Sequence, residues 1–81
     1  MHLSEAACEI LDLFRVENRK PGARILIGTL DANVGTEPVV AAAVSELTDL
    51  EYVIAADADT VELTARGFDA VRRGDYRQSR H

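Results

Sequence analysis

The sequence predicts one small α+β domain, and three patterns support this prediction. Apolar residues recur at helical spacing in two long segments, 4–18 and 36–50. A β-hairpin pattern follows at 52–64, and a short helical pattern at 65–73. The chain has 81 residues, 47% of them hydrophobic, which suffices for one modest core. We expect the domain to cover residues 1–74 and residues 75–81 to form a flexible tail, because no apolar pattern continues there.

The first element is an amphipathic helix from Ser4 to about Asn18. Ser4 is a favourable N-terminal cap, and Pro21 with Gly22 ends the helical pattern. Acidic residues occupy the outward face. The inward face is predicted to contain Leu3, Ala6, Ala7, Ile10, Leu13 and Phe14.

The segment between the two long helices is short and ambiguous. Residues 24–27 form an apolar run bounded by glycines, which fits either a brief strand or the entry to a second helix. Asp31, Asn33 and Gly35 then predict a turn, because Asn, Asp and Gly favour turn conformations.

The second long helix begins after Thr36, a favourable cap, and tolerates Pro38 in its first turn. Helical projection predicts a buried stripe of Val40, Ala43, Val44, Leu47 and Leu50. The same projection turns Ala41, Ala42, Ser45 and Asp49 outward.

The final part of the chain predicts a hairpin and a short helix. β-Branched and aromatic residues flank residues 57–59, where we expect a loop of at least three residues. Thr64 caps the helix 65–73, which ends at Gly74. Phe68 and Val71 face inward.

This order of elements, together with the sequence Leu63-Thr64-Ala65-Arg66-Gly67, resembles the winged helix-turn-helix domains of prokaryotic transcription regulators. The resemblance covers residues 3–73 as topology and residues 47–67 as pattern. It implies a winged-helix-like fold: helix 1, a short strand or helix 2, helix 3, a β-hairpin wing and a short C-terminal helix. It also implies base contacts from the outward face of residues 37–49 and phosphate contacts from the wing.

The chain departs from that pattern at both DNA-contacting places. Residues 36–50 contain no Lys, Arg, Asn or Gln, the side chains that read base edges. The wing tip carries Asp57 and Asp59, which would repel phosphates. We therefore predict that the outward face, Ala41, Ala42, Ser45 and Asp49, contacts protein rather than DNA.

Charge is distributed unevenly along the chain. The net charge is −5, and residues 25–65 contain eight acidic residues and no basic one. Basic residues gather at the two ends, where the resemblance implies that the first and last helices lie close together. They form a candidate patch for nucleic acid or for the acidic face of a second copy, or they only balance the acidic middle. The patch consists of Arg15, Arg19, Lys20, Arg24, Arg66, Arg72 and Arg73.

No enzymatic site is expected. One cysteine and two terminal histidines supply no metal-ligand set, no cofactor motif is present, and no catalytic constellation can be assembled. Cys8 beside Arg15 suggests either a redox-sensitive thiol or a small buried hydrophobe. The N-terminus lacks a signal-peptide pattern and no run is long enough for a membrane span, so we expect a cytoplasmic protein.

Two functions stay open. The first is a non-enzymatic, transcription-associated interaction module that binds protein, either another protein or a second copy of itself. A homodimer through the first helix would use Cys8, Leu11 and Val16, which lie outside the predicted inward stripe. The second is a DNA-binding regulator that uses its basic ends or is adapted to high salt, which would screen the long-range repulsion.

Overall fold

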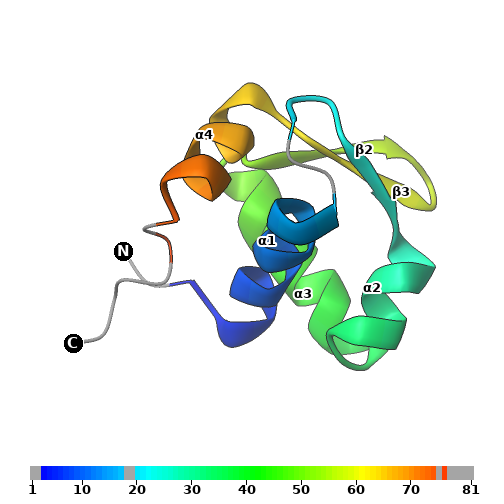
Figure 1. Cartoon of the computed structure of the whole chain (residues 1–81). Helices are drawn as coiled ribbons and strands as arrows, with labels where there is room; N and C mark the ends of the chain where they lie inside the picture. The colour runs from blue at the N-terminus through cyan, green and yellow to red at the C-terminus, as the bar shows by residue number, and fades with distance from the viewer. Residues whose placement is uncertain (1–2, 18–19, 75, 77–81) are drawn as a thin grey trace.

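The structure is a computed structural model that describes residues 3–17, 20–74 and 76. Within these described residues, four helices and three strands follow one another in an α+β, winged-helix-like arrangement (Figure 1). Their order is α1 (Glu5–Glu17), β1 (Arg24–Leu26), α2 (Ile27–Asn33), α3 (Glu37–Asp49), β2 (Val53–Asp57), β3 (Thr60–Leu63) and α4 (Ala65–Arg73). The predicted fold class is confirmed.

The sheet is antiparallel, with β3 in the centre and β1 and β2 at its edges. Ile25 and Ala55 are both paired with Val61, one on each side of β3. The hairpin β2–β3 runs across one side of the domain, with its tip next to the start of α2, and we call it the wing (Figure 1). One face of the sheet contributes Ile25, Val61 and Leu63 to the core, and the opposite face stays open to solvent.

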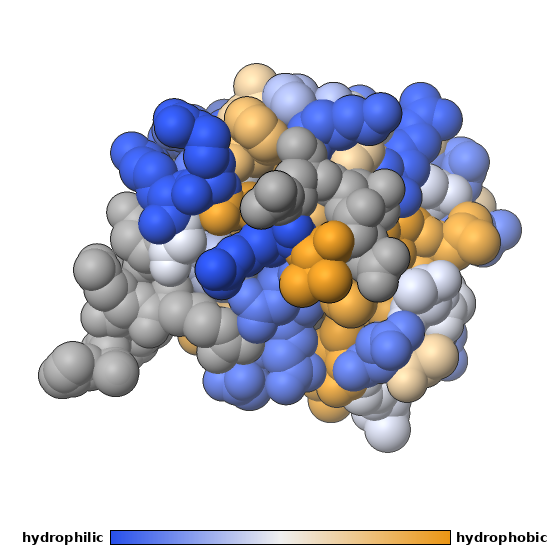
Figure 2. Space-filling model, in the orientation of Figure 1, coloured by the Kyte–Doolittle hydropathy of each residue, from blue (hydrophilic) through white to orange (hydrophobic). Residues whose placement is uncertain are grey.

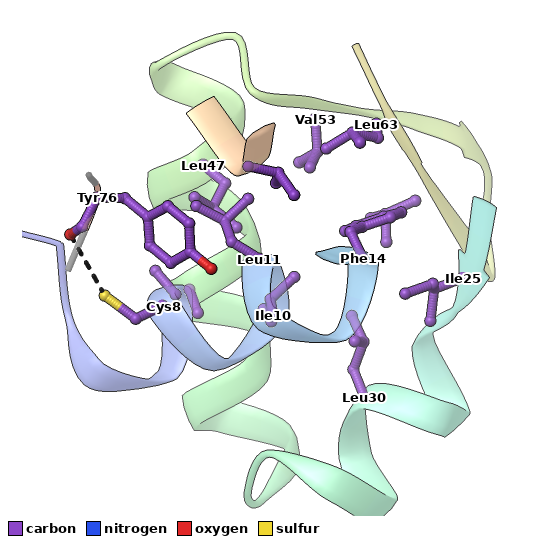
Figure 3. Close-up of a cluster of buried hydrophobic side chains, with 14 of the residues drawn as sticks. Cys8, Ile10, Leu11, Phe14, Ile25, Leu30, Leu47, Val53, Leu63 and Tyr76 are labelled. Atoms are coloured by element: carbon purple, nitrogen blue, oxygen red, sulfur yellow. Dashed lines mark hydrogen bonds between the residues drawn. The ribbon is translucent and has the colours of Figure 1, made fainter. Parts of the chain in front are cut away.

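The core lies between α1, α3 and the inner face of the sheet (Figure 3). Phe14, Ile10 and Leu11 of α1 are fully buried, and α1 packs against both α3 and α4. Burial of this apolar surface is the main stabilising term for so short a chain.

The junction between α3 and the wing is held by Thr64 and Gly67. The Thr64 hydroxyl donates to the carbonyls of Glu51 and Tyr52 at 2.6 and 3.0 Å, and accepts from the Gly67 N–H at 2.9 Å. Glu51 has a φ of +64°, which reverses the chain after α3. A Cβ at Gly67 would lie 2.0 Å from the Tyr52 carbonyl oxygen, so only glycine fits there.

Most local predictions along the helices are confirmed. The Ser4 hydroxyl caps α1 by accepting from the Ala7 N–H at 3.1 Å. Thr64 caps α4, and Gly74 ends it in the left-handed conformation. Thr36 begins α3 as predicted, but its side chain makes no cap hydrogen bond. The buried stripe of α3 is confirmed, with Val40, Ala43 and Leu47 buried and Val44 and Leu50 half-buried.

The ambiguity at residues 24–27 resolves into a strand followed at once by a helix. Arg24–Leu26 pairs with β3, and Ile27 begins α2. The predicted turn at Asp31 and Asn33 is therefore wrong, because both residues lie inside α2. The fully buried Leu30 anchors this helix, so tertiary packing overrides weak local propensity.

The wing loop is shorter than predicted. β2 ends at Asp57 and β3 begins at Thr60, which leaves Ala58 and Asp59 as a two-residue turn. A register shift between Ala55 and Asp57 places an extra residue in β2. The bulge in β2 takes up the extra residue that the prediction places in the loop.

The first helix buries more of its surface than one stripe. Leu11 is 0% exposed and Cys8 6%, although both were predicted to lie outside the inward stripe. The reason is that α4 and Tyr76 cover this second face (Figure 3). Tyr76, assigned to the flexible tail, is itself buried, and its carbonyl accepts from the Cys8 thiol at 3.8 Å. Residues 75 and 77–81 of that tail lie outside the described residues.

Candidate functional site

The outward face of α3 is a surface of small and acidic side chains. Ala41, Ala42, Ser45 and Asp49 are all exposed, as predicted. On the side of α3 toward α1, the Glu46 carboxylate accepts from the backbone N–H and the hydroxyl of Ser4, at 2.9 and 2.8 Å. These bonds add to the apolar contacts that hold α3 against α1.

Four further residues of α3 are exposed and were not predicted as part of this surface: Glu37, Pro38, Val39 and Thr48. Val39 is exposed at the start of the helix, and Thr48 is exposed near its end. The Thr48 hydroxyl already donates to the Val44 carbonyl at 2.8 Å, so its proton is not available to a partner. Val39 falls beside the predicted buried stripe. The projection of a single helix cannot show that Val39 is left uncovered by the rest of the domain.

The wing tip carries fixed negative charge. The Asp57 carboxylate accepts from the Asp59 N–H at 2.9 Å, and this backbone hydrogen bond is the largest cause that lowers the Asp57 pKa below its usual value. Asp59 is exposed beside it. At neutral pH the tip therefore presents an ionised carboxylate where a DNA-binding wing needs a cation.

The open face of the sheet adds two exposed apolar side chains. Arg24, Glu62 and Ile54 form one row across the three strands. In this row the Arg24 guanidinium binds the Glu62 carboxylate at 3.1 Å. Ile54 is 46% exposed in β2, and Leu26 is 58% exposed in β1.

The predicted basic patch is assembled only in part. Arg15 of α1 and Arg72 of α4 line the same cleft, with Phe68 and Val71 between them. Arg24 lies on β1, Arg66 lies at the start of α4, and the exposed Lys20 precedes β1. Arg19 lies outside the described residues.

Most described cations of the patch are paired with carboxylates. Arg66 binds Glu51 at 3.3 Å, and Arg72 and Arg73 both bind Asp69, at 2.8 and 3.5 Å. The Arg72 hydrogen bond is the largest cause that lowers the Asp69 pKa. These pairs are exposed, so they contribute little stability, but they reduce the positive potential that a polyanion would meet. Figure 2 shows the hydrophilic side chains gathered over α4.

Tyr76 connects the C-terminal side of the domain to α1. Its hydroxyl donates to the Asp12 carboxylate. Burial, followed by this hydrogen bond, raises the Tyr76 pKa to about 12, while Arg15 acts in the opposite direction. Arg15 therefore lies close to the Tyr76 hydroxyl, and nothing in the sequence pattern indicated that contact.

Among residues 3–17, 20–74 and 76, no group of three or more His, Cys, Asp or Glu side chains is placed to hold a metal ion. No helix in this part of the chain has the length and apolar character needed to cross a membrane. Comparison with known proteins gives no match to a protein-family model, a curated protein or a solved structure.

Proposed function

We propose that the chain is a small, non-enzymatic, transcription-associated interaction module of the winged helix-turn-helix kind that binds protein through the outward face of α3. One observation carries this proposal. The helix that the resemblance assigns to base recognition exposes Ala41, Ala42, Ser45 and Asp49 and contains no Lys, Arg, Asn or Gln, the side chains that make the bidentate contacts to guanine and adenine.

Small side chains suit a protein contact at this place. Alanine and serine let a second backbone approach closely, and they lose little side-chain entropy on binding. The acidic wing tip, which lies next to the start of α2, also disfavours a phosphate backbone but not a neutral or basic protein surface. A second copy of the chain is the first partner to test, because no other chain is needed for the experiment.

A homodimer through the first helix cannot use all three residues that the sequence suggested for it. Cys8 and Leu11 are buried within one copy of the chain, where Tyr76 and α4 cover them. Val16 is 76% exposed and remains available for such a contact. One exposed valine buries too little apolar area to hold a dimer by itself, so α3 is the stronger candidate.

Sedimentation velocity over a range of protein concentrations tests the α3 face directly. We expect wild-type protein to associate reversibly and Ala42→Arg to stay monomeric, because the long cationic side chain blocks close packing. Ala32→Arg is the matched control, since Ala32 is also an exposed helical alanine but lies on α2. If both variants associate equally, or if the wild type is monomeric at every concentration, the hypothesis of self-association through α3 is rejected.

A DNA-binding regulator is the second candidate, and the shared cleft of Arg15 and Arg72 favours it. Fluorescence anisotropy of a labelled random duplex, at low salt and again in concentrated KCl, separates the two proposals. Binding that collapses as salt rises would indicate cooperation of the basic ends. Binding that persists in concentrated KCl would indicate adaptation to high salt. We expect no binding in either condition.

A further inference from the structure

A cleft of about 420 Å³ lies between the C-terminal part of α1 and α4. Its described lining consists of two guanidinium groups and two apolar side chains: Arg15, Phe68, Val71 and Arg72. The volume falls within the range of about 300–1,000 Å³ that is usual for small-molecule sites. The apolar floor of the cleft is chiefly the half-buried Phe68, since Val71 is only 2% exposed.

We propose that this cleft binds a small organic monocarboxylate with an apolar or aromatic body. The carboxylate would bind between Arg15 and Arg72, and the body would lie against Phe68 and the edge of Val71. Guanidinium is the group best suited to a carboxylate, because its planar array of N–H donors can form two parallel hydrogen bonds.

Arg72 can bind a ligand without leaving a neighbouring carboxylate unpaired. It now binds one oxygen of Asp69 at 2.8 Å, while Arg73 binds the other oxygen at 3.5 Å. If a ligand takes Arg72, Arg73 still compensates the Asp69 charge. The Arg72 side chain is 63% exposed, so its reorientation meets little steric resistance.

Arg15 also has donors to spare. It lies near the Tyr76 hydroxyl and moderates the rise in the Tyr76 pKa that burial and Asp12 produce. A guanidinium has five N–H donors, so one contact with Tyr76 leaves others for a ligand. Arg15 and Arg72 come from different helices, and α1 packs directly on α4, which holds the two groups on opposite sides of one cleft.

The local charge favours a single negative charge over a polyanion. Among the described residues, the charged groups that line the cleft are the guanidiniums of Arg15 and Arg72, and the pairing of Arg72 with Asp69 reduces their combined positive potential. The whole chain carries a net charge of −5, which repels polyanions at long range. The apolar floor adds affinity only for a ligand with an apolar body.

Titration of the ¹⁵N-labelled full chain with 4-phenylbutyrate, followed by two-dimensional NMR, tests the proposal. We expect saturable shifts of amide signals in α4 and in the last turn of α1, with a dissociation constant below about 1 mM. The neutral probe 4-phenylbutanol should bind at least about tenfold more weakly, which corresponds to roughly 1.4 kcal/mol. Shifts that do not saturate, lie elsewhere, or are equal for the alcohol would overturn the proposal.

Variants assign the contact to the two guanidiniums. Arg15→Gln and Arg72→Gln should each weaken 4-phenylbutyrate binding about tenfold. Arg66→Gln is the matched control, since Arg66 is also an exposed, carboxylate-paired arginine of α4 but does not line the cleft in the described structure, and its affinity should be unchanged. The dispersion of each spectrum reports whether the variant is folded, and Arg72→Lys provides a conservative alternative. A folded Arg72→Gln protein with wild-type affinity would reject the site.

Discussion

Two neighbouring regions of the sequence differ in what restrains them. One is the junction between α3 and the wing, and the other is the outward face of α3. At the junction, Thr64 alone takes part in three side-chain hydrogen bonds, and Gly67 lies against backbone. On the outward face, Ala41, Ala42 and Ser45 are exposed and carry no structural task in the described domain. The residues of the junction are therefore constrained by the fold. The residues of the outward face of α3 are not, so they can be used to bind a partner. Under the proposed function, this difference would let the chain keep a winged-helix-like fold while the outward face of α3 contacts protein instead of DNA.

The largest expected effect comes from Gly67→Ala, which tests whether the junction is as restrained as the geometry indicates. The new Cβ would lie 2.0 Å from the Tyr52 carbonyl oxygen and force the backbone apart. We expect a loss of about 3 kcal/mol in the free energy of unfolding. The thermal midpoint should fall by roughly 12 °C or more, measured by circular dichroism.

Gly28→Ala is the control for that experiment. No atom lies within 4 Å of a Cβ built at Gly28, which sits inside α2. Alanine favours helix over glycine by up to about 1 kcal/mol, so this variant should be neutral or stabilised. Similar destabilisation of both variants would mean that the loss at Gly67 is not caused by the close approach to Tyr52.

A smaller effect is expected from Thr64→Val, which keeps the shape of the side chain but removes its hydrogen bonds. Loss of the cap to Gly67 and of the bond to the Glu51 carbonyl should lower the free energy of unfolding by about 1–2 kcal/mol. Thr36→Val is matched, because Thr36 also precedes a helix but makes no cap bond, and it should change stability by less than about 0.5 kcal/mol. Urea unfolding of both variants measures the difference. Equal losses of unfolding free energy in both variants would show that the cap hydrogen bond of Thr64 does not stabilise the start of α4.

The smallest expected effect concerns the wing tip and depends on pH. The folded-state pKa of Asp57 is lowered, chiefly by the Asp59 N–H, so its contribution to stability is present above the unfolded value of 3.8. That contribution is lost as pH falls through the folded-state pKa. Asp57→Ala should thus lower the thermal midpoint slightly at neutral pH, and the gap to wild type should close in acid.

Asp59→Ala supplies the comparison at the wing tip. It removes the same formal charge but retains the backbone N–H that Asp57 accepts from. The variant should therefore keep the neutral-pH midpoint closer to wild type than Asp57→Ala does. A gap for Asp57→Ala that stays constant from neutral to acidic pH would show that the hydrogen bond to the carboxylate is not its source.

The sequence predicted those parts of the fold that depend on local chemistry. The Ser4 and Thr64 caps, the Gly74 terminus and the buried stripe of α3 all follow from periodicity and capping rules. The helix at 27–33 was missed because Asp31 and Asn33 favour turns, and only the burial of Leu30 against distant residues outweighs that preference.

The sequence predicted which residues of α3 face outward, but it did not predict which residues of different helices come together. The outward residues of α3 follow from helical projection, because one helix determines which of its side chains share a face. The meeting of Arg15 with Arg72 and the burial of Leu11 depend on how α4 and Tyr76 pack on α1. Such contacts join residues more than fifty positions apart, and local patterns contain no information about them.

The left-handed conformation of Glu51 has a consequence for how this chain would respond to selection. A glutamate at a φ of +64° is held in a conformation that glycine or asparagine adopts more readily. Its carboxylate binds Arg66 at the surface, a contact of small energetic value. In a library screened only for thermal stability, position 51 should thus be among the first to mutate, toward Gly or Asn. Persistence of glutamate in such a library would identify its side chain, rather than its backbone, as the property under selection.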